Sequence, residues 1–132
     1  MWTCPNCERS IKNPNQWHYC AKVDMDSLFE GKSDELILIF DKLLIGSVEW
    51  ENVAVSATKN CIVFVHHQTF FILRPMKKLL DLKFYSQQEL TVFPVLKSIP
   101  YFGKFENHVR LSHIEEVTDS ILKMIKSSYQ LL

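Results

Sequence analysis

The chain has 132 residues, of which 47% are hydrophobic, and its 15 basic and 15 acidic side chains give a net charge of zero. This composition excludes a chain that is disordered throughout, and no apolar stretch approaches the roughly 20 residues of a membrane-spanning helix. The charge is uneven, however, because residues 59–110 carry eight Lys or Arg against three Asp or Glu. This basic segment predicts either an anion-facing surface or ordinary solvated strand faces.

Residues 1–22 carry the most specific motif of the chain. Cys4 and Cys7 form a Cys-x2-Cys pair, and after ten intervening residues His18 and Cys20 form a His-x-Cys pair. Three thiolates and one imidazole are a ligand set that binds structural Zn2+ tetrahedrally. A Cys-x-x-Cys pair alone could also be a redox motif, but no βαβ pattern surrounds it. We therefore expect a zinc knuckle over residues 1–22, with one structural Zn2+ per chain.

The ligand set also bears on chemistry and compartment. Four protein ligands close the coordination sphere, whereas a catalytic zinc keeps one position open for water. The metal is therefore expected to stabilise the fold without taking part in a reaction. Thiols committed to zinc, together with an amino terminus (Met1-Trp2-Thr3) that lacks an apolar leader, favour a cytoplasmic location and no membrane partner.

Two helices are expected in the α/β domain that residues 23–132 form. A helical turn over residues 25–30 precedes a longer helix, which Ser33 caps and Gly46 ends. The carboxy-terminal helix starts at a capping-box signature over residues 112–115 and carries an apolar stripe at helical spacing.

Alternating or continuous apolar runs between the two helices predict about five antiparallel strands. The expected strands cover residues 53–57, 61–66, 69–74, 79–85 and 104–111. Residues 86–103 are expected to be irregular, because Pro94 and Pro100 are incompatible with a central strand.

These elements together predict an α+β fold. It consists of an N-terminal zinc knuckle, a helix, an antiparallel meander sheet of about five strands and a C-terminal helix, with both helices on one sheet face. The expected core members between sheet and helices are Phe40, Phe64, Ile72, Leu82, Ile121 and Ile125.

A candidate ligand-binding site consists of Arg74, His108 and Arg110. Arg74 ends one predicted strand, while His108 and Arg110 lie two residues apart on another and so share a face. If these strands are neighbours, the three side chains converge on the sheet face away from the helices. Arginine forks suit phosphate or carboxylate, and an imidazole can donate or transfer a proton. The alternative is a pair of surface arginines with carboxylate partners such as Asp81 or Glu106.

Several stretches of the chain resemble one known family. They are Trp2-Thr3-Cys4-Pro5-Asn6-Cys7-Glu8-Arg9, Asn15-Gln16-Trp17-His18-Tyr19-Cys20, Ser27-Leu28-Phe29-Glu30-Gly31-Lys32, Thr69-Phe70 with Arg74-Pro75, and His108-Val109-Arg110-Leu111 with the final helix. These residues are similar to those of small bacterial proteins grouped as domain of unknown function 5655. The resemblance covers nearly the whole chain and implies an α/β domain behind a zinc-binding-like amino terminus. It implies no reaction.

The search for catalytic motifs leaves two classes of function. The sequence contains no P-loop, dinucleotide fingerprint or nucleophile elbow, and three glycines cannot supply a Gly-rich phosphate cradle. The first class is a non-enzymatic binding module, whose basic sheet face meets an anionic partner such as nucleic acid. The second is a small enzyme that uses His108 and Arg110 in a cleft for acid–base or phosphate chemistry. We favour the binding module, and the sequence assigns no catalytic residue.

Overall fold

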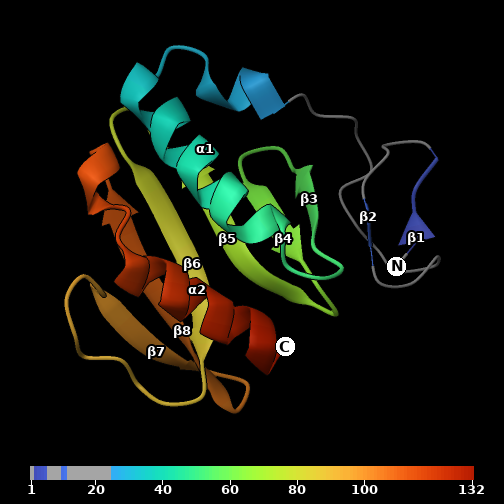
Figure 1. Cartoon of the computed structure of the whole chain (residues 1–132), viewed down its shortest axis with the longest axis vertical. Coiled ribbons are helices and arrows are strands. Elements are labelled where there is room, and N and C mark those ends of the chain that lie inside the picture. Colours follow the sequence, from blue (N-terminus) through green and yellow to red (C-terminus); the bar gives the residue numbers. More distant parts are fainter. Residues whose placement is uncertain (1, 6–9, 12–24) are drawn as a thin grey trace.

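The computed structural model of the chain describes residues 2–5, 10–11 and 25–132. The strands are β1 (Trp2–Thr3), β2 (Ser10–Ile11), β3 (Ala54–Ala57), β4 (Ile62–Val65), β5 (Thr69–Pro75), β6 (Leu80–Ser86), β7 (Lys97–Tyr101) and β8 (Lys104–Leu111). The helices are α1 (Asp34–Val48), α2 (Asp119–Leu131) and the 3₁₀-helices η1 (Met25–Phe29) and η2 (Ile114–Glu116). Figure 1 shows α1 and α2 as one layer in front of the larger sheet.

The larger sheet is antiparallel, with six strands in the order β3-β4-β5-β6-β8-β7. The α+β class is confirmed, and the five predicted strands are confirmed as β3, β4, β5, β6 and β8. The helical turn predicted over residues 25–30 is confirmed as η1. The prediction of about five strands in a simple meander is wrong, because β7 is a sixth strand and β8 lies between β6 and β7.

Strand β7 falls in the segment that the two prolines marked as irregular. It includes Pro100 and pairs with β8 on one side only. At the edge of a sheet a proline can turn its missing N–H away from the neighbouring strand, so it interrupts no ladder. The prolines therefore exclude a central strand, as expected, but they do not exclude an edge strand.

The core lies between the sheet and the helix layer. On β6, Leu80, Leu82 and Phe84 are fully buried, whereas the intervening Asp81 and Lys83 are partly exposed, as the two-residue repeat of a strand requires. The fully buried partners of β6 across this core include Leu36, Ile39 and Leu43 of α1 and Ile121 and Ile125 of α2.

One predicted core residue lies on the wrong face. Ile72 is only partly buried, because its neighbours Phe71 and Leu73 are the β5 residues that face the helices. Strand alternation then turns Ile72 to the opposite face, where its register partner is Lys83. The other five predicted core residues are buried.

Gly46 does not end the first helix, which continues to Val48. A Cβ atom at this position would lie 3.0 Å from Cδ2 of Leu122 on α2. The glycine is therefore explained by the close approach of the two helices and not by helix termination.

The carboxy-terminal helix starts later than predicted, and a separate turn precedes it. Thr118 caps α2 by accepting a hydrogen bond from the backbone N–H of Ile121 at 3.4 Å. Ahead of it, the Glu116 carboxylate accepts the backbone N–H groups of Ser112 at 2.9 Å and His113 at 2.8 Å. These bonds hold η2 as its own element, because they satisfy N–H groups that have no helical partner.

Candidate functional site

The face of the sheet opposite α1 and α2, which we name the outer face, carries the candidate ligand-binding residues. The outer-face residues of β5, β6, β7 and β8 are Ile72, Arg74, Asp81, Lys83, Tyr85, Lys97, Ile99, Tyr101, Lys104, Glu106, His108 and Arg110. Five of these side chains are Lys or Arg and two are carboxylates, so the face has an excess of positive charge.

Arg74, Asp81 and Arg110 form a row across three adjacent strands. Arg74 is the register partner of Asp81, and Asp81 is the register partner of Arg110. The two arginine backbones are therefore two strand spacings apart, or about 10 Å. Arg110 Nε lies 4.0 Å from Asp81 Oδ1, and the Arg110 side chain is 55% exposed. Arg74 is exposed and makes no ion pair with any residue that the structure describes.

The row tests the expectation that Arg74, His108 and Arg110 converge on one face of the sheet. The structure brings Arg74, His108 and Arg110 to one face, but β6 lies between the two strands that carry them. The carboxylate partner that the sequence offered for an arginine is present for Arg110 and is Asp81. One carboxylate thus lies between two guanidinium groups, and one positive charge remains without a counterpart in the row.

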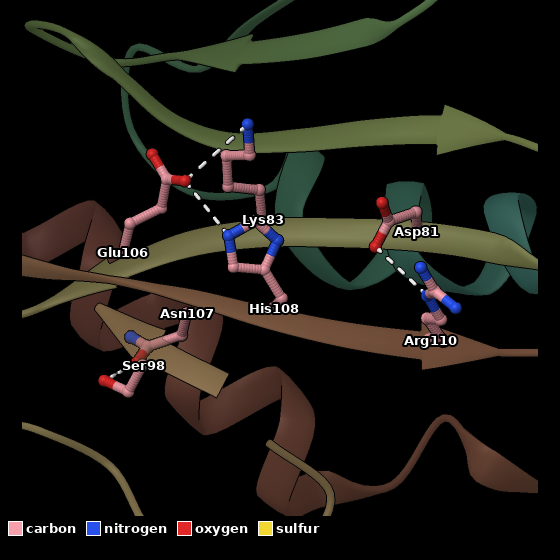
Figure 2. A network of polar contacts seen from close by, with 7 residues as sticks. All are labelled: Asp81, Lys83, Ser98, Glu106, Asn107, His108 and Arg110. Carbon is pink, nitrogen blue, oxygen red and sulfur yellow. Dashed lines mark hydrogen bonds and ion pairs between the residues drawn. The ribbon is translucent and has the colours of Figure 1, made fainter. Parts of the chain in front are cut away.

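His108 lies in a second group, which Figure 2 shows around Glu106. Glu106 Oε1 lies 3.0 Å from His108 Nε2 and 3.8 Å from Lys83 Nζ. The His108 and Glu106 side chains are 14% and 13% exposed. The next strand adds Lys97, the register partner of His108. The Glu106 carboxylate therefore interacts with His108 and Lys83, whereas the Lys97 side chain is exposed to solvent.

The aromatic end of the outer face is a feature that the sequence reasoning missed. The ring centroids of Tyr85 and Tyr101 are 5.6 Å apart, and those of Tyr101 and Phe102 are 4.8 Å apart. Lys104 Nζ lies 5.6 Å from the Tyr85 ring and 5.8 Å from the Tyr101 ring, within cation–π range. Burial, and then the Glu106 carboxylate and Tyr101, raise the pKa of Tyr85 to about 12, so its hydroxyl stays protonated. The signal available in the sequence was the run Tyr-Phe-Gly-Lys, which is typical of a hairpin turn with exposed rings.

A polar network on the other side of β8 positions the edge strand. Asn107 is fully buried, and its Oδ1 accepts the hydroxyl of Ser98 at 2.5 Å while its Nδ2 donates to Ser86 Oγ at 3.0 Å. Ser98 Oγ in turn accepts the backbone N–H of Leu90 at 3.2 Å. Figure 2 shows Asn107 and Ser98 pointing away from His108 and Glu106. These bonds fix β7 and the segment before it, and so fix the edge of the outer face.

Two hollows among the described residues lie elsewhere. One, of about 410 Å³, is lined by Phe93, Pro94, Leu111, Glu115, Glu116, Thr118 and Ser120. The other, of about 480 Å³, is lined by Ser33, Glu35, Lys78, Ser112 and His113. Neither has Arg74, His108 or Arg110 in its wall, so these three residues belong to a surface and not to either hollow.

Of the four expected zinc ligands, Cys7, His18 and Cys20 lie outside the described residues. Cys4 is described, is 5% exposed and directly follows β1. Strands β1 and β2 pair as an antiparallel ladder with Trp2 opposite Ile11 and Thr3 opposite Ser10. Among the described residues, no three His, Cys, Asp or Glu side chains are grouped so that they could hold a metal ion.

Comparison with known families matches residues 25–132 to the model of domain of unknown function 5655 (DUF5655). The chain belongs to the DUF5655 family. The match covers η1, both α-helices and the whole six-stranded sheet. No curated protein and no solved structure matches the DUF5655 chain. Neither of the α-helices described within residues 25–132 has the length and apolar character that crossing a membrane requires.

Proposed function

We propose that the DUF5655 domain is a binding module whose outer face engages an anionic partner through Arg74, His108 and Arg110. The observation that carries this proposal is the row in which two arginines flank the single carboxylate of Asp81. Two arginines whose backbones are about 10 Å apart can contact two different anionic groups of one partner, which favours a polyanion over a single small ion.

Nucleic acid is the polyanion that best fits this charge pattern. Lys83, Lys97 and Lys104 extend the positive charge along the face beyond the arginines. His108, beside Glu106, contributes a hydrogen-bond donor or acceptor within the same surface. A row of cations on an exposed sheet tracks a phosphate backbone without requiring a closed pocket.

The experiment measures binding of a short labelled abasic oligodeoxynucleotide, which presents phosphates without bases. We expect the wild-type protein to bind this probe and the double variant Arg74→Ala/Arg110→Ala to bind it at least about tenfold more weakly. The matched control is Lys42→Ala/Lys123→Ala, which removes two exposed positive charges from the helix layer. Equal affinities of the two double variants would reject the proposed function.

The enzyme alternative requires a substrate-sized hollow beside His108. The two hollows described above are walled by other residues, and His108 is hydrogen-bonded to Glu106 at the outer face. The proposal of binding over catalysis is supported by the row of cations on the outer face.

We also propose that residues 1–22 hold one structural Zn2+ through Cys4, Cys7, His18 and Cys20. The ligand spacing supports this, and so does the burial of Cys4 directly after β1, which pairs with β2. Elemental analysis of protein purified without added metal should find about one equivalent of zinc. Cys7→Ser should abolish it, and Cys61→Ser, which changes a cysteine next to β4, should not. A metal-free preparation with an unchanged melting temperature would contradict the structural role.

A further inference from the structure

The hairpin between β7 and β8 carries an aromatic side chain in an unfavourable position. Phe102 has φ 46° and the following Gly103 has φ 80°, so both central residues of the turn lie in the left-handed region. Asn-Gly and Gly-Gly are the usual choices there, and for a bulky residue a positive φ is an outlier. The Phe102 side chain is 88% exposed, so burial within this chain does not compensate for the strain.

The exposed ring continues the aromatic end of the outer face. Phe102 meets Tyr101 at an interplanar angle of 87°, so at least one face of the Phe102 ring stays open. Tyr101 is 41% exposed, whereas Tyr85 beneath it is 7% exposed and supports the cluster from the sheet. Lys104 Nζ lies over the two tyrosine rings, and the Tyr101 ring in turn contacts Phe102, so the aromatic end of the outer face includes a positive charge.

The rings and the arginines lie at opposite ends of one strip along β8. From Lys104 to Arg110 the strand advances six residues, or about 20 Å. An extended polyanion laid along this strip would reach Lys104, Lys97 and Arg110 in turn, with one end at Phe102. The strip thus combines a cationic track with a stacking ring, which is the combination that binds single-stranded nucleic acid.

We propose that the partner is a single-stranded nucleic acid. One of its bases stacks on Phe102, and its backbone phosphates contact Lys104, Lys97, Arg110 and Arg74. This inference rests on the proposed function, because it assigns the phosphates to the same outer face. A duplex keeps its base faces inside the stack, so an exposed ring at the end of the strip selects a single strand.

A membrane surface fits the geometry less well. If the hairpin tip entered a bilayer, Arg110 and Arg74 would remain about 20 Å away along the strand. That distance exceeds the Debye length of about 8–10 Å at physiological salt, so the arginines would add little attraction to anionic lipids. A single-stranded nucleic acid laid along β8 would contact Phe102 at one end of the strip and the arginines at the other.

The test compares Phe102→Asn with wild type on four probes. The probes are a mixed-sequence single-stranded oligonucleotide, its duplex, the abasic strand and vesicles of phosphatidylserine and phosphatidylcholine. Asn-Gly suits this turn, so the variant is expected to fold. The matched control is Phe93→Asn, because Phe93 is 92% exposed but lies beside α2 and η2, away from the outer face.

We expect Phe102→Asn to bind the mixed single strand about tenfold more weakly and the abasic strand as wild type does. Phe102→Tyr, which keeps the ring, and Phe93→Asn should bind both strands as wild type does. The inference is overturned if wild type binds the abasic strand or the duplex as tightly as the mixed strand. It is also overturned if Phe102→Asn binds the mixed strand like wild type, or if it loses only vesicle binding.

The failure of this inference differs from the failure of the proposed function. If Arg74→Ala/Arg110→Ala alone loses the abasic strand while Phe102→Asn changes nothing, the outer face binds phosphates and the stacking role is rejected. If Arg74→Ala/Arg110→Ala binds the abasic strand like wild type, both the proposed function and this inference are rejected.

Discussion

Ser128 of α2 donates its hydroxyl to the backbone carbonyl of Phe70 on β5 at 2.6 Å. The same oxygen accepts the backbone N–H of Tyr85 on β6 at 2.9 Å. The β5–β6 ladder has Phe71 opposite Phe84 as its last pair at this end, so the serine joins the next two backbone groups across the gap. Ser128 is fully buried, and it is the point at which the helix layer completes the hydrogen bonding of the sheet.

Replacing Ser128 by Ala should therefore destabilise the fold. The change leaves a buried N–H and a buried C=O without their partner, which costs about 1–3 kcal/mol. Urea denaturation measures the free energy of unfolding. The control is Ser127→Ala, since Ser127 is exposed and donates its hydroxyl to the Lys123 carbonyl of its own helix, and it should change stability by less than about 0.5 kcal/mol. Equal effects of the two variants would show that the bridge adds no stability.

Much of this fold could be predicted from the sequence because the strands coincide with alternating or continuous apolar runs. The alternation of Leu80, Leu82 and Phe84 with charged residues fixes both the strand and its buried face. Ser128 could not be predicted as a core residue, because its burial depends on where two strands separate. The role of Gly46 could not be predicted for a similar reason, since the packing of Leu122 against it explains the glycine.

The candidate site was predictable to a smaller extent. The two-residue spacing of His108 and Arg110 correctly put them on one face, and the antiparallel register then added Arg74. The order of the strands, with β8 inserted beside β6, is a long-range property that no local pattern encodes. Phe102 could not be predicted as part of the site, because the sequence of a short turn does not show that a hydrophobic residue has a positive φ and an exposed side chain.

Replacing Phe102 by Asn should stabilise the protein while it weakens single-strand binding. Asn tolerates the left-handed conformation, so relief of strain should raise the free energy of unfolding by about 1 kcal/mol. Thermal and urea unfolding measure this, with Phe102→Tyr as the variant that keeps the strain. A stability unchanged or lowered by Phe102→Asn would mean that the ring contributes to the fold through Tyr101.

Glu116 should make the stability of the fold sensitive to acid. The hydrogen bond from the Ser112 backbone lowers the pKa of Glu116, burial raises it in part, and the His113 backbone lowers it further. Because the folded pKa lies below the ordinary value, the carboxylate stabilises the fold above its unfolded pKa, and this contribution is lost as the pH falls through the folded pKa.

Glu116→Gln should therefore destabilise the fold near neutral pH by less than about 1 kcal/mol, because solvent screens the carboxylate, and this difference should shrink in acid as the pH falls through the folded pKa. Urea unfolding across this range measures the difference from wild type. The control is Glu115→Gln at the neighbouring exposed position. A difference between Glu116→Gln and wild type that stays constant with pH would show that the ionised carboxylate is not the stabilising form.

The arginine pair should set the salt dependence of binding to the single-stranded probe. Each phosphate neutralised on a single strand adds about 0.7 to the slope of log affinity against log salt concentration. Removing Arg74 and Arg110 together should therefore make this slope shallower by about 1.4. Phe102→Asn should lower the affinity without changing the slope, because stacking neutralises no phosphate. Fluorescence anisotropy at several salt concentrations gives both quantities. An unchanged slope in Arg74→Ala/Arg110→Ala would mean that the phosphates lie elsewhere on the protein.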